Sequence, residues 1–247
     1  AESPRRGTDL GSCAASAAST AAGLGPRRGG IALLRQAEDL SDLVRAAGQP
    51  LTGTLRMSVI PTIAPFLLPR LLPRLRKDRP DLELFLREET SSDAVESLHH
   101  GRVDCVLLAL PFATGEVEQA LIGKDRFFVA YPGDEPRDLP EEIRPETIED
   151  GRLLLLEDGH CLKEHALAAC NRPELRAATS MIGTSLHTLV QMVDNGLGVT
   201  MLPEMALEAG ILKGTRVIAR PLDAPAATRD IALIWRKNSP READFLL

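Results

Sequence analysis

From Leu51 onward the sequence alternates between strand-like and helix-like patterns, and this alternation limits the fold more than any other feature. Short apolar runs bounded by Pro, Gly or Asp predict strands, while apolar residues spaced three and four apart predict helices. The first predicted elements are a strand at 55–62, a helix at 64–78, a strand at 81–89, a helix at 91–101 capped by Ser91 or Ser92, and a strand at 103–110. This order requires a parallel sheet with right-handed crossovers, so we expect an α/β fold.

A second set of elements follows the first. It contains strands at 121–132, 152–157, 176–181, 198–203, 215–222 and 228–236, with helices at 159–170 and 183–196. Two α/β units joined by crossing strands leave a cleft between them, which is the usual ligand site of such folds. We therefore expect two Rossmann-like subdomains, with subdomain I at about 51–120 plus 227–247 and subdomain II at about 121–226.

The first 50 residues have a different character. Residues 1–30 are mainly Ala, Gly, Ser and Arg, which bury too little apolar surface to offset the entropy of ordering, so we expect a disordered, low-complexity tail. This segment also lacks the apolar core of a signal peptide, so we expect a cytoplasmic protein with reduced cysteines. Residues 31–50 have helical apolar spacing that ends at Gly48 and Pro50, which predicts either an ordinary amphipathic helix or a dimerising linker helix.

The composition excludes several classes of protein. The hydrophobic fraction of 44% and the charged fraction of 26% are those of a globular chain. No apolar run reaches about 18 residues, so we expect no membrane span. A formal net charge of −6 argues against a surface built to coat nucleic acid, but it does not exclude a small basic module. Four cysteines in 247 residues are too few for a disulfide scaffold.

The strongest chemical signal is the segment LLLLEDGHCLKEHALAAC, in which an apolar strand leads through a turn into a helix that begins near Cys161. A helix N-terminus stabilises a thiolate through the helix dipole and the free backbone N–H groups. The neighbouring His160 and Lys163 add positive charge when protonated. Because the thiolate is the form that attacks peroxides and disulfides, Cys161 is a candidate reactive thiol.

Cys170 follows nine residues later, and three interpretations of the pair stay open. In one helix the two side chains would lie roughly 13.5 Å apart along the axis, whereas a disulfide needs Cα atoms within about 7 Å. Bond formation would therefore have to unwind the helix and act as a conformational switch. Alternatively, Cys170 is a small buried apolar residue, or Cys161 and His165 contribute to a zinc site. Because the segment lacks a CxxC pair, we expect no metal and no cofactor, and we assign Cys105 to the core.

The run EDGHCLKEHALAAC closely resembles the redox segment of OxyR-type hydrogen-peroxide-sensing regulators, which belong to the LysR-type transcriptional regulator family. The similarity extends over about 51–247 and includes SVIPTIAPFLLPRLLP, SLHTLVQMVDNGLGVTMLP and IALIWR. The Gly-His-Cys-Leu motif with its distal cysteine is the specific part, whereas the other motifs fit many LysR-type effector domains. The resemblance implies two subdomains of periplasmic-binding-protein type.

The resemblance also implies residue roles. Cys161 corresponds to the peroxidatic cysteine and Cys170 to the resolving cysteine. Four further residues correspond to groups that hold or orient peroxide, namely Thr62, Thr90, His160 and Arg229. From the sequence pattern alone, a local cap or turn residue is the favoured interpretation of each threonine. Lys163 and Glu164 replace the usual Arg-Asp pair, which keeps the charges but changes their reach.

Residues 1–30 do not resemble the winged helix-turn-helix that precedes the linker helix in this family, so we expect the DNA-binding part to be missing or disrupted in this sequence. The resemblance implies a homodimer or homotetramer, a thiol reductant system that resets the switch, no membrane partner, and promoter DNA only with a restored winged helix-turn-helix. Two alternatives stay open. One is a LysR-type effector domain that binds a small organic anion, and the other is a thiol-dependent enzyme, although we expect no enzymatic activity.

Overall fold

A computed structural model describes residues 50–134, 139–171 and 182–247 of the chain. All of these described residues belong to one compact unit. The expected tail at 1–30, nearly all of the expected linker helix at 31–50 and the predicted strand at 176–181 lie outside the described residues.

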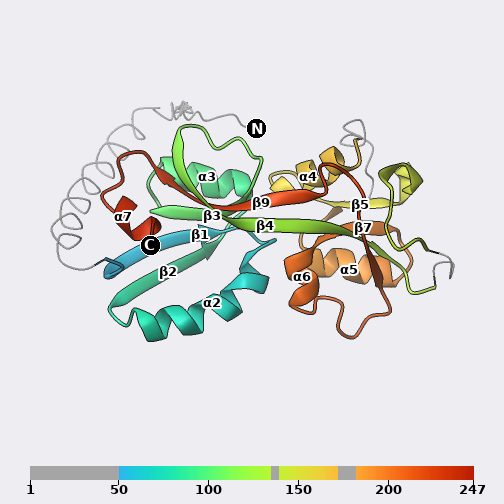
Figure 1. The fold of residues 1–247 in the computed structure, drawn as a ribbon, viewed down its shortest axis with the longest axis horizontal. Coiled ribbons are helices and arrows are strands. Elements are labelled where there is room, and N and C mark those ends of the chain that lie inside the picture. Colours follow the sequence, from blue (N-terminus) through green and yellow to red (C-terminus); the bar gives the residue numbers. More distant parts are fainter. Residues whose placement is uncertain (1–49, 135–138, 172–181) are drawn as a thin grey trace, which may run out of the picture. The chain divides into compact units, whose positions relative to one another are not determined.

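The first predicted β-α-β-α-β unit is present, with small changes at its boundaries (Figure 1). Strand β1 pairs in parallel with β2 and with β3, as a βαβ crossover requires. The N-cap of helix α3 is Thr90, whose side chain accepts a hydrogen bond from the Asp93 N–H, so the expectation of Ser91 or Ser92 at this position was wrong. The elements are β1 (Gly53–Val59), α2 (Ala64–Asp78), β2 (Leu82–Glu88), α3 (Ser91–His99) and β3 (Cys105–Leu110).

The second set of elements contains the cysteine segment. Its helix α4 follows the buried strand β5 after a short turn, and helix α5 begins at the N-cap Ser185, which accepts a hydrogen bond from the Thr188 N–H. The elements are β4 (Val117–Tyr131), 3-10 helices at Pro145–Thr147 and Asp150–Arg152, β5 (Leu153–Leu156), α4 (Cys161–Ala169), β6 (Ile182–Gly183), α5 (Leu186–Asp194), β7 (Val199–Pro203), α6 (Glu204–Glu208), β8 (Ile218–Pro221), β9 (Thr228–Arg236) and α7 (Glu242–Phe245).

The long strands β4 and β9 connect the two sets of elements. They pair antiparallel from Val117 opposite Arg236 to Arg126 opposite Thr228. Strand β9 also pairs with β3, while the far end of β4 pairs with β7 and β8. The resulting strand order is β2-β1-β3-β9-β4-β7-β5-β6, with β8 beside β4. The predicted α/β class with crossing strands is therefore confirmed.

The buried apolar residues form two clusters, and the two candidate cysteines belong to different ones. Cys161 packs in the cluster built mainly on β1, β3 and β9. Cys170 packs in the cluster built mainly on the C-terminal part of β4, on β5 and β7, and on helices α4 and α5. The first residue of α4 therefore lies in one core, while the helix from Leu162 onward packs in the other. Cys105 is buried in the first cluster, as expected for a core residue.

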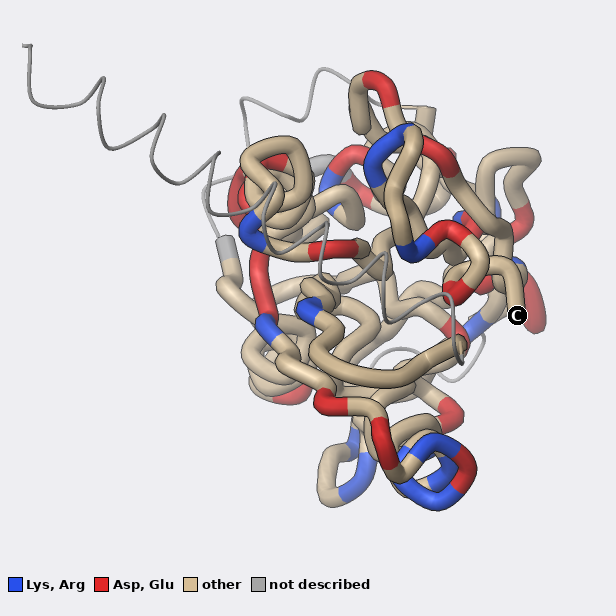
Figure 2. Tube along the Cα trace, turned by 90° about the vertical axis from the view of Figure 1, so that its left-hand side faces the viewer, with Lys and Arg blue, Asp and Glu red and all other residues tan. Residues whose placement is uncertain are grey.

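The surface charge is unevenly distributed. Helix α2, at the bottom of Figures 1 and 2, carries the basic residues Arg70, Arg74, Arg76 and Lys77. Acidic residues occur over much of the rest of the described chain in Figure 2. None of the described helices is long and apolar enough to cross a bilayer.

Candidate functional site

Cys161 is the first residue of α4 and is 1% exposed. Its backbone N–H donates a hydrogen bond to the Ser91 hydroxyl oxygen at 3.2 Å. The Ser92 backbone N–H and hydroxyl both donate to the Gly159 carbonyl oxygen, each at 3.3 Å. The N-termini of α3 and α4 therefore meet at Cys161, and both helix dipoles present their positive ends to this region.

Gly159 permits this close approach of the two helices. Its φ is +94°, a conformation that L side chains rarely adopt. A Cβ atom on Gly159 would lie 2.8 Å from the Ser92 hydroxyl oxygen and 3.4 Å from the Thr90 hydroxyl oxygen. The Asp-Gly turn predicted from the sequence is thus also a steric requirement of the site.

Cys170 lies at the opposite end of the same helix, where it is the C-cap residue. Cys105, Cys161 and Cys170 are all free thiols. The helix between Cys161 and Cys170 keeps their Cα atoms roughly 13 Å apart. Burial, with a smaller contribution from the nearby Glu146 carboxylate, raises the pKa of the Cys170 thiol to about 11. Cys170 is therefore protonated and unreactive in this conformation.

Arg229 and Thr62 form a buried contact close to the start of α2. Arg229 on β9 is 1% exposed, and its Nη1 donates to Thr62 Oγ1 at 2.8 Å while Nη2 donates to the Thr62 carbonyl oxygen at 3.0 Å. Its Nε and Nη2 also donate to Asp125 Oδ2 at 3.0 and 2.9 Å. Asp125 was not among the predicted site residues, although a lone acid within the strand pattern GKDRFFVAY was a usable signal.

Thr90 and His160 meet in a different place, at a pocket of about 390 Å³ between the α3 side and the β5–α5 side. The Thr90 hydroxyl also donates to Asp93 Oδ2 at 2.9 Å, so it acts as a local cap in this conformation. The His160 side chain is buried, and its Nε2 lies 3.7 Å from Glu157 Oε1. Burial lowers the pKa of His160, although the Glu157 carboxylate partly opposes this effect.

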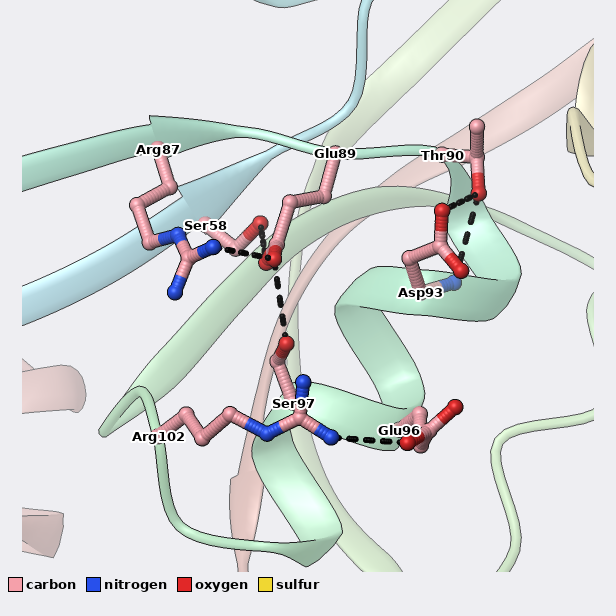
Figure 3. Close-up of polar contacts among 8 residues, drawn as sticks. All are labelled: Ser58, Arg87, Glu89, Thr90, Asp93, Glu96, Ser97 and Arg102. Atoms are coloured by element: carbon pink, nitrogen blue, oxygen red, sulfur yellow. Dashed lines mark hydrogen bonds and ion pairs between the residues drawn. The ribbon is translucent and has the colours of Figure 1, made fainter. Parts of the chain in front are cut away.

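The pocket is mainly acidic. The Arg102 guanidinium in its wall pairs with Glu96 at 2.7 Å, and Glu89 accepts hydrogen bonds from the Ser58 and Ser97 hydroxyls at 2.9 and 3.1 Å (Figure 3). Such a lining disfavours an anion and accommodates a small neutral molecule. The acidic residues of the lining are Glu88, Glu89, Asp93, Glu96 and Glu157.

The remaining polar residues of α4 are held by local contacts. Lys163 Nζ is paired with Asp158 Oδ1 at 2.7 Å, which ties the first turn of the helix to the preceding loop. His165, weighed as a zinc ligand, instead has Nε2 at 2.8 Å from the Pro111 carbonyl oxygen. Among the described residues, no group of three or more His, Cys, Asp or Glu side chains is arranged to hold a metal ion.

Comparison with known proteins identifies the relatives of this chain. The family model described as "LysR substrate binding domain" matches residues 48–246. The HTH-type transcriptional regulator EstR of Acinetobacter baylyi is 39% identical over 216 residues, which cover 86% of this chain and 70% of that protein. The hydrogen peroxide-inducible genes activator of Haemophilus influenzae is 34% identical over 209 residues, which cover 84% of this chain and 69% of that protein. The reduced regulatory domain of OxyR2 from Vibrio vulnificus superposes with a TM-score of 0.74 at 37% identity, covering 80% of this chain and 93% of that one.

Proposed function

The chain belongs to the LysR-type family of transcriptional regulators, and from this premise we propose that it senses hydrogen peroxide through a thiol–disulfide switch between Cys161 and Cys170. The observation that carries the proposal is the placement of these two thiols at opposite ends of one short helix, each in a different apolar core. The similarity to the hydrogen peroxide-inducible genes activator of Haemophilus influenzae and to the OxyR2 regulatory domain of Vibrio vulnificus supports it. The name of EstR mentions no peroxide, so the proposal needs its own test.

The proposed chemistry begins at Cys161. Its thiolate attacks one peroxide oxygen, so that an S–O bond forms, the O–O bond breaks and hydroxide leaves as water after taking a proton. The product is a sulfenic acid at Cys161. The Cys170 sulfur, as its thiolate, then attacks the Cys161 sulfur. The S–S bond forms, the S–O bond of the sulfenic acid breaks, and hydroxide leaves as a second water after taking a proton.

The second step requires a change of structure. Cα atoms roughly 13 Å apart in a helix cannot be bridged by a disulfide, which tolerates about 7 Å. Helix α4 must therefore unwind at one or both ends, and Cys170 must leave the core that raises its thiol pKa to about 11. Because α4 joins two apolar cores, its remodelling is the conformational signal that we propose for this protein.

The roles proposed for the surrounding residues follow from their chemistry. The hydroxyls of Thr62 and Thr90 and the imidazole of His160 would orient the peroxide, and Arg229 would favour negative charge on the leaving oxygen. A small neutral peroxide is compatible with the acidic pocket at His160, whereas a small organic anion would face Glu88, Glu89 and their neighbours. Among the three functions weighed, peroxide sensing is therefore the one that the site supports best.

The remaining parts of the proposal concern the whole regulator. We propose subdomains at about 51–120 plus 227–247 and at about 121–226, a homodimer or homotetramer, and a cytoplasmic location. A cellular thiol reductant would reset the switch, and promoter DNA would be contacted through a winged helix-turn-helix. The protein would consume peroxide once per cycle as a signal and would not act as an enzyme.

Mapping of the thiols by mass spectrometry tests the proposal. The reduced chain is treated with one equivalent of hydrogen peroxide, and free thiols are then alkylated in denaturant before digestion. We expect a Cys161–Cys170 disulfide and an alkylated Cys105, and the Cys105→Ser control should form the same Cys161–Cys170 disulfide. Cys161→Ser should abolish the disulfide, and Cys170→Ser should leave a sulfenic acid that dimedone traps at Cys161. Free thiols at both positions in the unaltered chain would refute the switch.

A further inference from the structure

His165 lies one helical turn after Cys161, on the inner face of α4, and is 5% exposed. Its Nε2 is 2.8 Å from the carbonyl oxygen of Pro111, the residue that follows β3. Its ring lies against Phe127 of β4, with 6.3 Å between the ring centroids. The side chain therefore connects α4 to the strands of both apolar clusters.

The protonation state of His165 follows from its partner. A carbonyl oxygen can only accept a hydrogen bond, so Nε2 carries a hydrogen, and in the neutral imidazole Nδ1 is then the unprotonated nitrogen. Nδ1 is buried and has no hydrogen-bond partner in the part of the chain that the structure describes. The imidazole is thus held as one neutral tautomer.

The surroundings of His165 oppose a positive charge. The charged group acting on the imidazole is Arg229 of β9, and the nearby acid, Asp125 of β4, is already paired with Arg229. The Pro111 carbonyl and the Phe127 ring, which also contact the imidazole, carry no charge. Burial lowers the pKa of His165 to about 4, with a smaller contribution from Arg229, and the hydrogen bond to Pro111 only partly opposes this shift.

We propose that His165 is a positioning residue that anchors α4, and with it Cys161, in the reduced conformation through its bond to Pro111, and that disulfide formation releases it to take up a proton. This inference rests on the proposed function, because unwinding of α4 is what frees the side chain. The reduced form, in which His165 is held neutral, therefore binds one proton fewer at low pH than the disulfide form, in which His165 is released.

The direction of the pH effect follows from the two states. In the anchored state the pKa of His165 is about 4, and in the released state it returns toward the ordinary 6.5. The stabilisation of the reduced conformation by neutral His165 is fully present above the pKa of the released side chain. It is lost as the pH falls toward the pKa of the anchored side chain. Lowering the pH from 7 to 5 should therefore favour the released, disulfide form by about 20-fold through this group.

Equilibration of the full chain in glutathione buffers tests the inference. Disulfide formation in the protein is coupled to reduction of glutathione disulfide to two glutathione molecules. Any proton that the cysteines themselves exchange is common to all variants, so it cancels in the comparison with His165→Gln. The disulfide fraction is measured at pH 7 and pH 5 in the unaltered chain, in His165→Gln and in His165→Leu. His100→Gln, at an exposed histidine of the α3 end, is the matched control.

We expect the unaltered chain and His100→Gln to shift toward the disulfide at pH 5. His165→Gln keeps a neutral donor for Pro111 but cannot be protonated, so its shift should be about 20-fold smaller. His165→Leu loses the donor and should favour the disulfide by about 5-fold at pH 7. An unchanged pH shift in His165→Gln would overturn the inference while leaving the switch intact. A wild-type chain that forms no disulfide would overturn the proposed function and this inference together.

Discussion

The proximity of Arg229 to the proposed peroxide site could be predicted from the sequence, but its hydrogen-bond partners could not. Its resemblance to a family arginine pointed to the peroxide site, but its buried hydrogen bonds to Thr62 and Asp125 depend on residues that are 167 and 104 positions away in the chain. No local pattern predicts such a contact. The guanidinium joins β9, β4 and the start of α2, so it has a structural role together with the proposed electrostatic one.

Replacing Arg229 with Lys tests this structural role. Lysine keeps the charge but cannot reach Thr62 Oγ1, the Thr62 carbonyl and Asp125 together, so buried polar groups lose partners. We expect a loss of about 2–3 kcal/mol in the free energy of unfolding, measured by urea denaturation. Arg70→Lys is the control, because its ion pair with Glu208 has both side chains 59% exposed and should contribute less than about 0.5 kcal/mol. Equal effects of the two substitutions would contradict the account.

At the scale of elements, the contact between the α3 and α4 N-termini organises the site. The hydroxyl-rich run Thr90-Ser91-Ser92 allowed several caps, and the sequence analysis assigned the wrong one because the choice depends on the neighbouring helix. Ser91 and Ser92 instead bond to Cys161 and Gly159 across the contact. A glycine in the loop before α4 was predictable as a turn, but its steric role required the structure.

Gly159→Ala should disrupt this contact more than an ordinary glycine replacement would. The added methyl group would approach the Ser92 hydroxyl at 2.8 Å, whereas a Cβ at Gly196 meets no atom within 4 Å although Gly196 also has positive φ. We expect Gly196→Ala to cost roughly 1 kcal/mol in stability, and Gly159→Ala to cost at least about 1 kcal/mol more. Gly159→Ala should also slow oxidation of Cys161 by peroxide, measured by rapid-quench alkylation. Matching stabilities and rates in the two variants would show that the contact does not position Cys161.

At the scale of the whole molecule, the sequence predicts individual strands and helices well, but it does not predict which distant strands pair with one another. The β-α-β alternation predicted the α/β class and most strands within a few residues, because the burial of each strand is recorded in its own residues. The antiparallel pairing of β4 with β9 joins residues more than one hundred positions apart, and it places Cys161 and Cys170 in different cores. Only the assembled sheet reveals that α4 connects those cores.

Backbone hydrogen exchange in α4 tests most directly the claim that peroxide remodels this helix. A change in exchange requires both that the Cys161–Cys170 disulfide forms and that α4 unwinds. In the reduced chain, the amides of the last turns of Cys161–Ala169 are hydrogen-bonded and should exchange slowly. After one equivalent of hydrogen peroxide, we expect these amides to exchange at rates near those of unstructured chain, while α5 (Leu186–Asp194) stays protected. Cys170→Ser should show no such change. A confirmed Cys161–Cys170 disulfide with unchanged protection in α4 would contradict the account.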